Sequence, residues 1–156
     1  RNIPFKVESD FEYLGMVNDV PMTLIGKPAL PATNYKDLTT WIGANKGKIN
    51  LGNAGIGSAS HLCGLLFQNA IQVDMTTVPY KGTAPAMTDL IAGTVAFAMD
   101  APSVVNPLIK AGRLNAIAVA VPKRMKTLPD IQLQRFEHPW FYIMLGNLLQ
   151  CYYLQL

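Results

Sequence analysis

Residues 48–62 read KINLGNAGIGSASHL, and this stretch decides the fold of the chain. A short apolar strand, Ile49–Leu51, leads into a loop of glycines and small residues, Gly52–Ser58, and the leucines that follow recur at helical spacing. The spacing predicts a helix that ends at Gln72. Its expected buried face carries Leu62, Leu65, Leu66 and Ala70. The stretch is therefore typical of one strand, loop and helix unit.

The same succession occurs twice more downstream. The expected strands are Met75–Val78, Val95–Met99 and Leu114–Val121. One expected helix is capped by Thr83 and has Gly93 past its end, and the other begins at Val104 and has Gly112 past its end. Because short loops join alternating strands and helices, the strands are expected to pair in parallel with right-handed crossovers. The sequence predicts an α/β three-layer sandwich with a mainly parallel sheet.

Upstream of these units, the sequence predicts two short strands, or one broken strand, and then a helix. The strands are Tyr13–Val17 and Met22–Ile25. The helix is capped by Thr33 or Asn34, carries Leu38, Trp41 and Ile42, and ends toward a left-handed Gly47.

Composition narrows the class of protein. Of 156 residues, 50% are hydrophobic and only 15% are charged, which favours one domain around a sizeable core. The net charge is +3 and the longest basic run is Lys123–Arg124, so nucleic-acid binding has no electrostatic basis. No stretch approaches the ~18 consecutive apolar residues of a membrane helix. Cys63 and Cys151 form no CxxC motif, and the leucines around Cys63 favour a buried, inert thiol.

The loop Gly52–Ser58 is the first candidate binding element. All three strand-to-helix loops are expected at the carboxyl edge of one sheet, where open α/β sheets bind ligands. Glycines and small residues leave backbone N–H groups uncovered at the positive end of a helix, which suits an anion. The spacing Gly52-x-x-Gly55-x-Gly57 matches no dinucleotide or nucleoside-triphosphate motif. A carboxylate or another small anion is open, and so is a plain tight turn that needs positive φ.

Two more features belong to the same edge. Lys81, Gly82 and Thr83 place a cation, a bare backbone and a hydroxyl at a helix start, although a solvated lysine beside an ordinary cap explains them as well. Asp100 ends a strand there, where it can cap the next helix or accept hydrogen bonds from a ligand.

No catalytic, metal or cofactor set stands out in the sequence. His61 lies in the first turn of its expected helix, where packing or capping is the favoured role. It forms no Ser-His-Asp order and no Cys-His pair. His138 is remote from it, and no grouped carboxylates accompany either histidine, so no metal site is expected.

Several linked motifs resemble one protein family. Residues 48–62, the stretch VPYKGTAPA at 78–86, IKAGRL at 109–114 and LPD at 128–130 resemble, in order and spacing, the substrate-binding proteins of tripartite tricarboxylate transporters. The resemblance extends from about Phe11 to Asp130.

The resemblance implies a periplasmic, two-lobed binding protein of the type II fold that captures a small carboxylate and delivers it to membrane permease subunits. It implies no enzymatic activity and no cofactor. The ligand-binding positions that it implies are Asn53, Ala54, Gly55, Gly57, Ser58, Lys81, Gly82, Thr83 and Asp100.

Two departures from the family pattern set the expected organisation. The first lobe, an expected partner, should precede residue 1, so the chain resembles mostly the second lobe. Residues 1–26 are then the hinge and first strands, 27–131 the ligand-binding α/β lobe and 132–156 an atypical tail. The aromatic residues of that tail could pack where the first lobe would lie, or mediate association.

Two other functions stay open at this point. An α/β enzyme could use the Gly52–Ser58 loop as an anion site, but it would need a nucleophile with a base. An effector-sensing lobe of a transcription regulator would need a helix-turn-helix segment, which the chain lacks.

Overall fold

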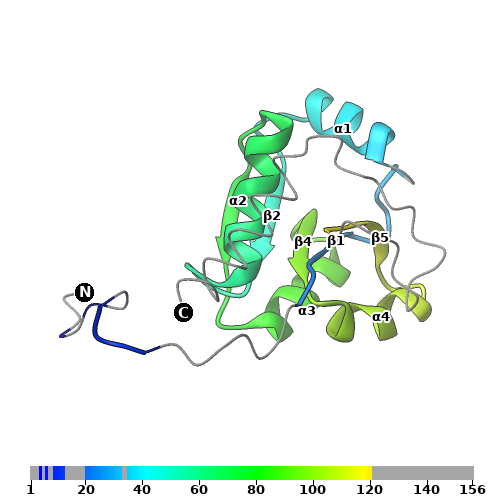
Figure 1. Cartoon of the computed structure of the whole chain (residues 1–156). Helices are drawn as coiled ribbons and strands as arrows, with labels where there is room; N and C mark the ends of the chain where they lie inside the picture. The colour runs from blue at the N-terminus through cyan, green and yellow to red at the C-terminus, as the bar shows by residue number, and fades with distance from the viewer. Residues whose placement is uncertain (1–3, 5, 7–8, 13–19, 33–34, 121–156) are drawn as a thin grey trace.

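The computed structural model describes residues 4, 6, 9–12, 20–32 and 35–120. These residues form a five-stranded sheet with helices on both faces (Figure 1). The strands are β1 (Thr23–Gly26), β2 (Asn50–Asn53), β3 (Thr76–Pro79), β4 (Phe97–Asp100) and β5 (Asn115–Val119). The helices are α1 (Tyr35–Ala44), α2 (Ala59–Ile71), α3 (Thr83–Ala92) and α4 (Pro102–Lys110). The strand expected at 13–17 and the tail at 132–156 lie outside the described residues.

The strand order is β3-β2-β4-β1-β5. Strand β2 pairs in parallel with both β3 and β4, as predicted, and the whole is a mixed α/β sheet. The exception is β1, which lies between β4 and β5 and runs antiparallel to both. Local sequence rules describe units that follow one another along the chain. They therefore do not predict that β1 lies between β4 and β5 in the sheet.

Alternation along the strands divides the core into two layers. Leu51, Phe97 and Met99 face α1 and α2, whereas Ile25 and Ala98 face α3 and α4. On the first face the ring of Trp41 meets that of Phe97 edge to face, with centroids 5.9 Å apart. Because helices cover both faces of the sheet, the ends of its strands are the parts that no helix layer covers.

Helix α2 buries a face that differs in part from the one that its leucines predict. Leu65 is 44% exposed and Ala70 is exposed, whereas Cys63 and Phe67 are buried. The reason is Gly64, which lets the helix approach β2 closely: a Cβ at Gly64 would lie 2.5 Å from Cδ2 of Leu51. The prediction of the helix is confirmed. On its predicted face Leu66 is buried and Leu62 half-buried, whereas the prediction is wrong for Leu65 and Ala70.

Most helix ends follow the sequence signals. Gln72 and Gly93 end α2 and α3 in the left-handed conformation, and Gly112 has φ 67° just after α4. Thr83 is not the cap of α3, because the N-cap is Gly82 and no side chain caps that end. Helix α4 begins two residues earlier than expected, because Pro102 suits the first helical position.

Within the described residues, no helix has the length and apolar character needed to cross a membrane.

Two helical glycines offer a matched test of the α2 packing. Gly64→Ala places a methyl group against buried Leu51, and we expect it to lower the free energy of unfolding by about 1–3 kcal/mol through overpacking. Gly43→Ala in α1 meets nothing within 4 Å, so it should raise that free energy by about 0.5–1 kcal/mol through helix propensity. Urea unfolding measures both, and equal effects would show that α2 does not need Gly64.

Cys63 offers a test of burial at the same helix. Burial raises the pKa of its thiol to about 11, so little of the reactive thiolate forms near neutral pH. In a Cys151→Ser variant, we expect native Cys63 to resist a thiol-specific disulfide reagent at pH 8 and to react fully in denaturant. Rapid labelling of the native protein would contradict the buried position.

Candidate functional site

The three strand-to-helix turns meet at the carboxyl edge of the sheet, as the sequence predicts. Asn53 and Pro79 are paired residues at the ends of β2 and β3, and Asp100 ends β4. The pairing continues beyond the strands, because Tyr80 N donates to Asn53 O at 2.9 Å and Gly82 N donates to Ala54 O at 3.1 Å. The turns after β2 and β3 are therefore bonded directly to each other.

Most amides of the 52–58 loop are already used within it. The bonds run from Ala54 N to Ser60 Oγ (2.9 Å), Gly55 N to Asn53 Oδ1 (3.0 Å), Gly57 N to His61 Nδ1 (3.2 Å) and Ser58 N to Gly55 O (3.1 Å). In this structure all four amides that were expected to face an anion already have an acceptor. The bonds instead fix the shape of the loop.

Ser58 is the N-cap of α2 and the centre of this bonding. Its hydroxyl accepts from His61 N at 3.2 Å, donates to Gly55 O at 2.7 Å and lies 3.0 Å from the Ser60 hydroxyl. His61 holds the loop through its imidazole, which agrees with the capping role expected for it. The atom of His61 that bonds to the Ser58 hydroxyl is the backbone nitrogen and not the imidazole. Within the described residues, the side chains of Ser58 and His61 therefore do not form a nucleophile and base pair.

Further backbone donors at this edge lie at the two helix starts. Within the described residues, the amides of Ala59 and Ser60 in α2 and of Thr83 and Ala84 in α3 donate no hydrogen bond. Amides at a helix N-terminus carry partial positive charge and suit an anion. Two helix starts thus face one edge, held together by bonded turns.

Two buried polar atoms at the same edge lack partners within the described part of the chain. They are Nδ2 of Asn53, which is 2% exposed, and Oγ1 of Thr23, which is fully buried and pairs across strands with Asp100. Native proteins rarely leave such atoms without a hydrogen bond. Thr23 was missed from the sequence because only the position of β1 in the sheet brings it here. Ser60, also missed, resembles any helical serine in the sequence.

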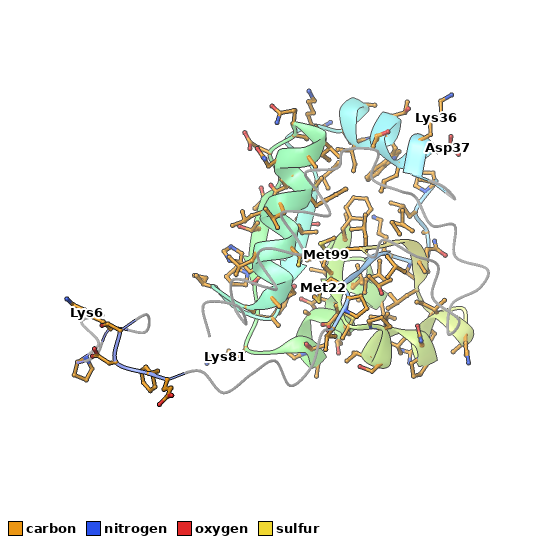
Figure 2. All side chains as sticks on the ribbon, viewed as in Figure 1. Lys6, Met22, Lys36, Asp37, Lys81 and Met99 are labelled. Carbon is orange, nitrogen blue, oxygen red and sulfur yellow. The ribbon has the colours of Figure 1, made fainter. Side chains whose placement is uncertain are left out.

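The charged residues of the edge differ in exposure. Lys81 is exposed, and Figure 2 shows it at the end of the molecule opposite Lys36 and Asp37 of α1. Asp100 is 8% exposed, and its Oδ1 accepts from Ala101 N at 2.7 Å. No side chain caps α4, whose N-cap is Ala101, so the capping role considered for Asp100 is wrong. Among the described residues no three His, Cys, Asp or Glu side chains group as metal ligands.

Comparison with known proteins gives a consistent result. Residues 1–137 match the model of the tripartite tricarboxylate transporter family receptor. A UPF0065 protein of Agrobacterium vitis is 39% identical over 130 residues, which cover 83% of this chain and 38% of that protein.

Solved structures agree with the sequence relatives. The periplasmic binding protein BugD is 37% identical with a TM-score of 0.71, and the match covers 84% of this chain and 50% of that one. Rpa4515 of R. palustris, solved with adipate, is 25% identical with a TM-score of 0.78, covering 97% and 57%. The chain therefore spans between 38% and 57% of these proteins.

The N-cap of α2 provides a test of how the loop is held. Ser58→Ala removes the cap and the bond to Gly55 O, so we expect the free energy of unfolding to fall by about 0.5–2 kcal/mol. The matched control is Ser103→Ala, because Ser103 is exposed on α4 and its hydroxyl has no hydrogen bond within the described residues; its effect should stay within about 0.5 kcal/mol. Urea unfolding compares the two, and equal effects would count against the capping role.

Proposed function

Because the chain belongs to the tripartite tricarboxylate transporter receptor family, we propose that its described lobe binds a small carboxylate at the carboxyl edge of the sheet. One observation carries this proposal. The first turns of α2 and α3 have amides without partners in the described chain, and the bond from Gly82 N to Ala54 O holds their turns side by side.

The electrostatics of the edge support an anionic ligand. Both helix N-termini contribute partial positive charge, and Lys81 adds a full positive charge at the start of α3. The two oxygens of a carboxylate can each accept hydrogen bonds, so one carboxylate can span two neighbouring sets of donors.

The nine proposed site residues divide into three groups. Asn53, Ala54, Gly55, Gly57 and Ser58 shape the loop before α2 through their mutual hydrogen bonds. Lys81, Gly82 and Thr83 form the approach to α3, and Asp100 closes the β4 end of the edge. Asp100 suits a hydrogen-bond donor on the ligand, because a second carboxylate beside it would be repelled.

The biological setting follows from the family. We propose a periplasmic protein that delivers its ligand to the permease subunits of a tripartite transporter, with a first lobe completing the binding cleft. The structure of Rpa4515 with adipate makes a dicarboxylate a reasonable first probe.

We further propose that the lobe does not catalyse a reaction. The family is a receptor family, and the Ser58 hydroxyl is engaged by backbone groups of Gly55 and His61. The loop amides that an enzyme would need as an oxyanion site already donate inside the loop.

Carboxylate titration of the chain tests the proposed function. One lobe leaves much of the ligand in water, so we expect dissociation constants in the millimolar range, about 4 kcal/mol of binding free energy. Calorimetry or NMR titration with mono-, di- and tricarboxylates, adipate included, measures this, and amide shifts should concentrate at Ala59, Ser60, Thr83 and Ala84. Absence of any such shift at saturating carboxylate would count against the site.

Gly55→Val should weaken this binding severalfold or more. The residue has φ 131°, and a Cβ there would lie 3.3 Å from Tyr80 O, so a branched side chain would separate the two turns. The matched control is Gly57→Val, because Gly57 also has positive φ (81°) but a Cβ there meets nothing within 4 Å. A larger loss of affinity with the control than with Gly55→Val would contradict this geometry.

A further inference from the structure

Tyr80 contacts three separate parts of the edge. Its hydroxyl donates to Oδ2 of Asp89, in α3, at 2.7 Å. Its ring lies against β2, where a Cβ on Gly52 would be 3.4 Å from Cε2. Its backbone continues the sheet, because Tyr80 N donates to Asn53 O, and its carbonyl oxygen lies beside Gly55. No other residue of the described turns joins β2, the glycine loop and α3 in this way.

The contact with Gly52 depends on a missing side chain. A Cβ at that position would also lie 3.3 Å from Cγ2 of Val95, so the space is shared between the Tyr80 ring and the core under α3. Glycine is a weak strand former, but at position 52 it leaves the space in which the Tyr80 ring packs against β2.

The bond to Asp89 holds the ring at its far end. Burial, followed by the hydrogen bond and the charge of Asp89, raises the pKa of Tyr80 to about 12, so the hydroxyl keeps its proton and remains a donor at physiological pH. Asp89 lies near the end of α3 opposite its first turn. The bond consequently links the turn before the helix to the body of the helix.

We propose that Tyr80 is a positioning residue of the site, whose bond to Asp89 sets the spacing between the first turns of α2 and α3 across which the ligand carboxylate is held. This rests on the proposed function. Four bonds, within the 52–58 loop and to the first turn of α2, fix that loop, whereas the α3 turn has Gly82 at its N-cap and no side-chain cap. The α3 turn thus takes its position from Tyr80 and from the bond between Gly82 N and Ala54 O.

A set of variants at the two partners of this bond tests the proposal. Tyr80→Phe keeps the ring and removes the donor, and Asp89→Ala removes the acceptor. Each should weaken adipate binding about three- to tenfold, and the double variant should be no weaker than either single one. Asp89→Asn keeps an acceptor oxygen and should bind within about twofold of the unsubstituted chain.

The matched control is Asp74→Asn, which removes a negative charge from an exposed residue before β3. Loss of a negative charge by itself favours an anionic ligand, so this control should not weaken binding. If it weakens binding as much as Asp89→Ala does, the loss does not depend on the bond to Tyr80 and the proposal is wrong. Equal affinity of Tyr80→Phe and the unsubstituted chain, even with a lower melting temperature, would also overturn it.

A readout without ligand separates this proposal from the proposed function. In Tyr80→Phe, native-state amide exchange should quicken at Tyr80 and Gly82, and should not change at Leu30, whose amide donates to Lys27 O at the opposite edge. Unchanged exchange at Gly82 refutes the positioning role. If the unsubstituted chain binds no carboxylate, the proposed function fails and exchange alone decides the role of Tyr80.

Discussion

The pairing of β2 with β3 on one side and with β4 on the other governs the rest of the structure. Parallel neighbours end at the same edge, so this pairing brings Asn53, Pro79 and Asp100 to one edge of the sheet. Asn50 reinforces it at the opposite edge, where its side chain accepts from Ala96 N at 2.7 Å and donates to Thr94 O at 2.9 Å. A slip in the β2 register would move both helix starts and the loops before them.

The hydrogen bonds of the 52–58 amides make this loop rigid, and rigidity bears on the affinity for a weakly bound ligand. A loop whose donors are already satisfied loses little conformational freedom when a ligand arrives, so less binding free energy is spent on ordering it. Under the proposed function, the same bonds leave the amides of the helix starts as the donors to the ligand. Ile56, at the tip of this loop, is 83% exposed, which places an apolar side chain beside the polar edge.

Sequence patterns predict most of the architecture because local rules produce it. Glycine and proline mark ends of α3 and α4, and alternating strands and helices predict a parallel sheet with its turns on one edge. The misses concern contacts between distant segments. Leu65 looks buried until Gly64 is seen against Leu51. The loop amides look free until Ser60 is seen to accept from Ala54 N and His61 from Gly57 N. The ligand-binding role of the nine residues stays a prediction.

The central place of β1 has a consequence for the order of events in folding. Of the five described strands, β1 is synthesised first, whereas its partners β4 and β5 are synthesised last. Until then the unit from β2 to β4 can assemble from contacts between neighbours, while β1 must close a long loop to enter the sheet. We therefore expect the carboxyl edge formed by β2, β3 and β4 to assemble before the sheet is complete. Insertion of β1 between β4 and β5 is then the late step.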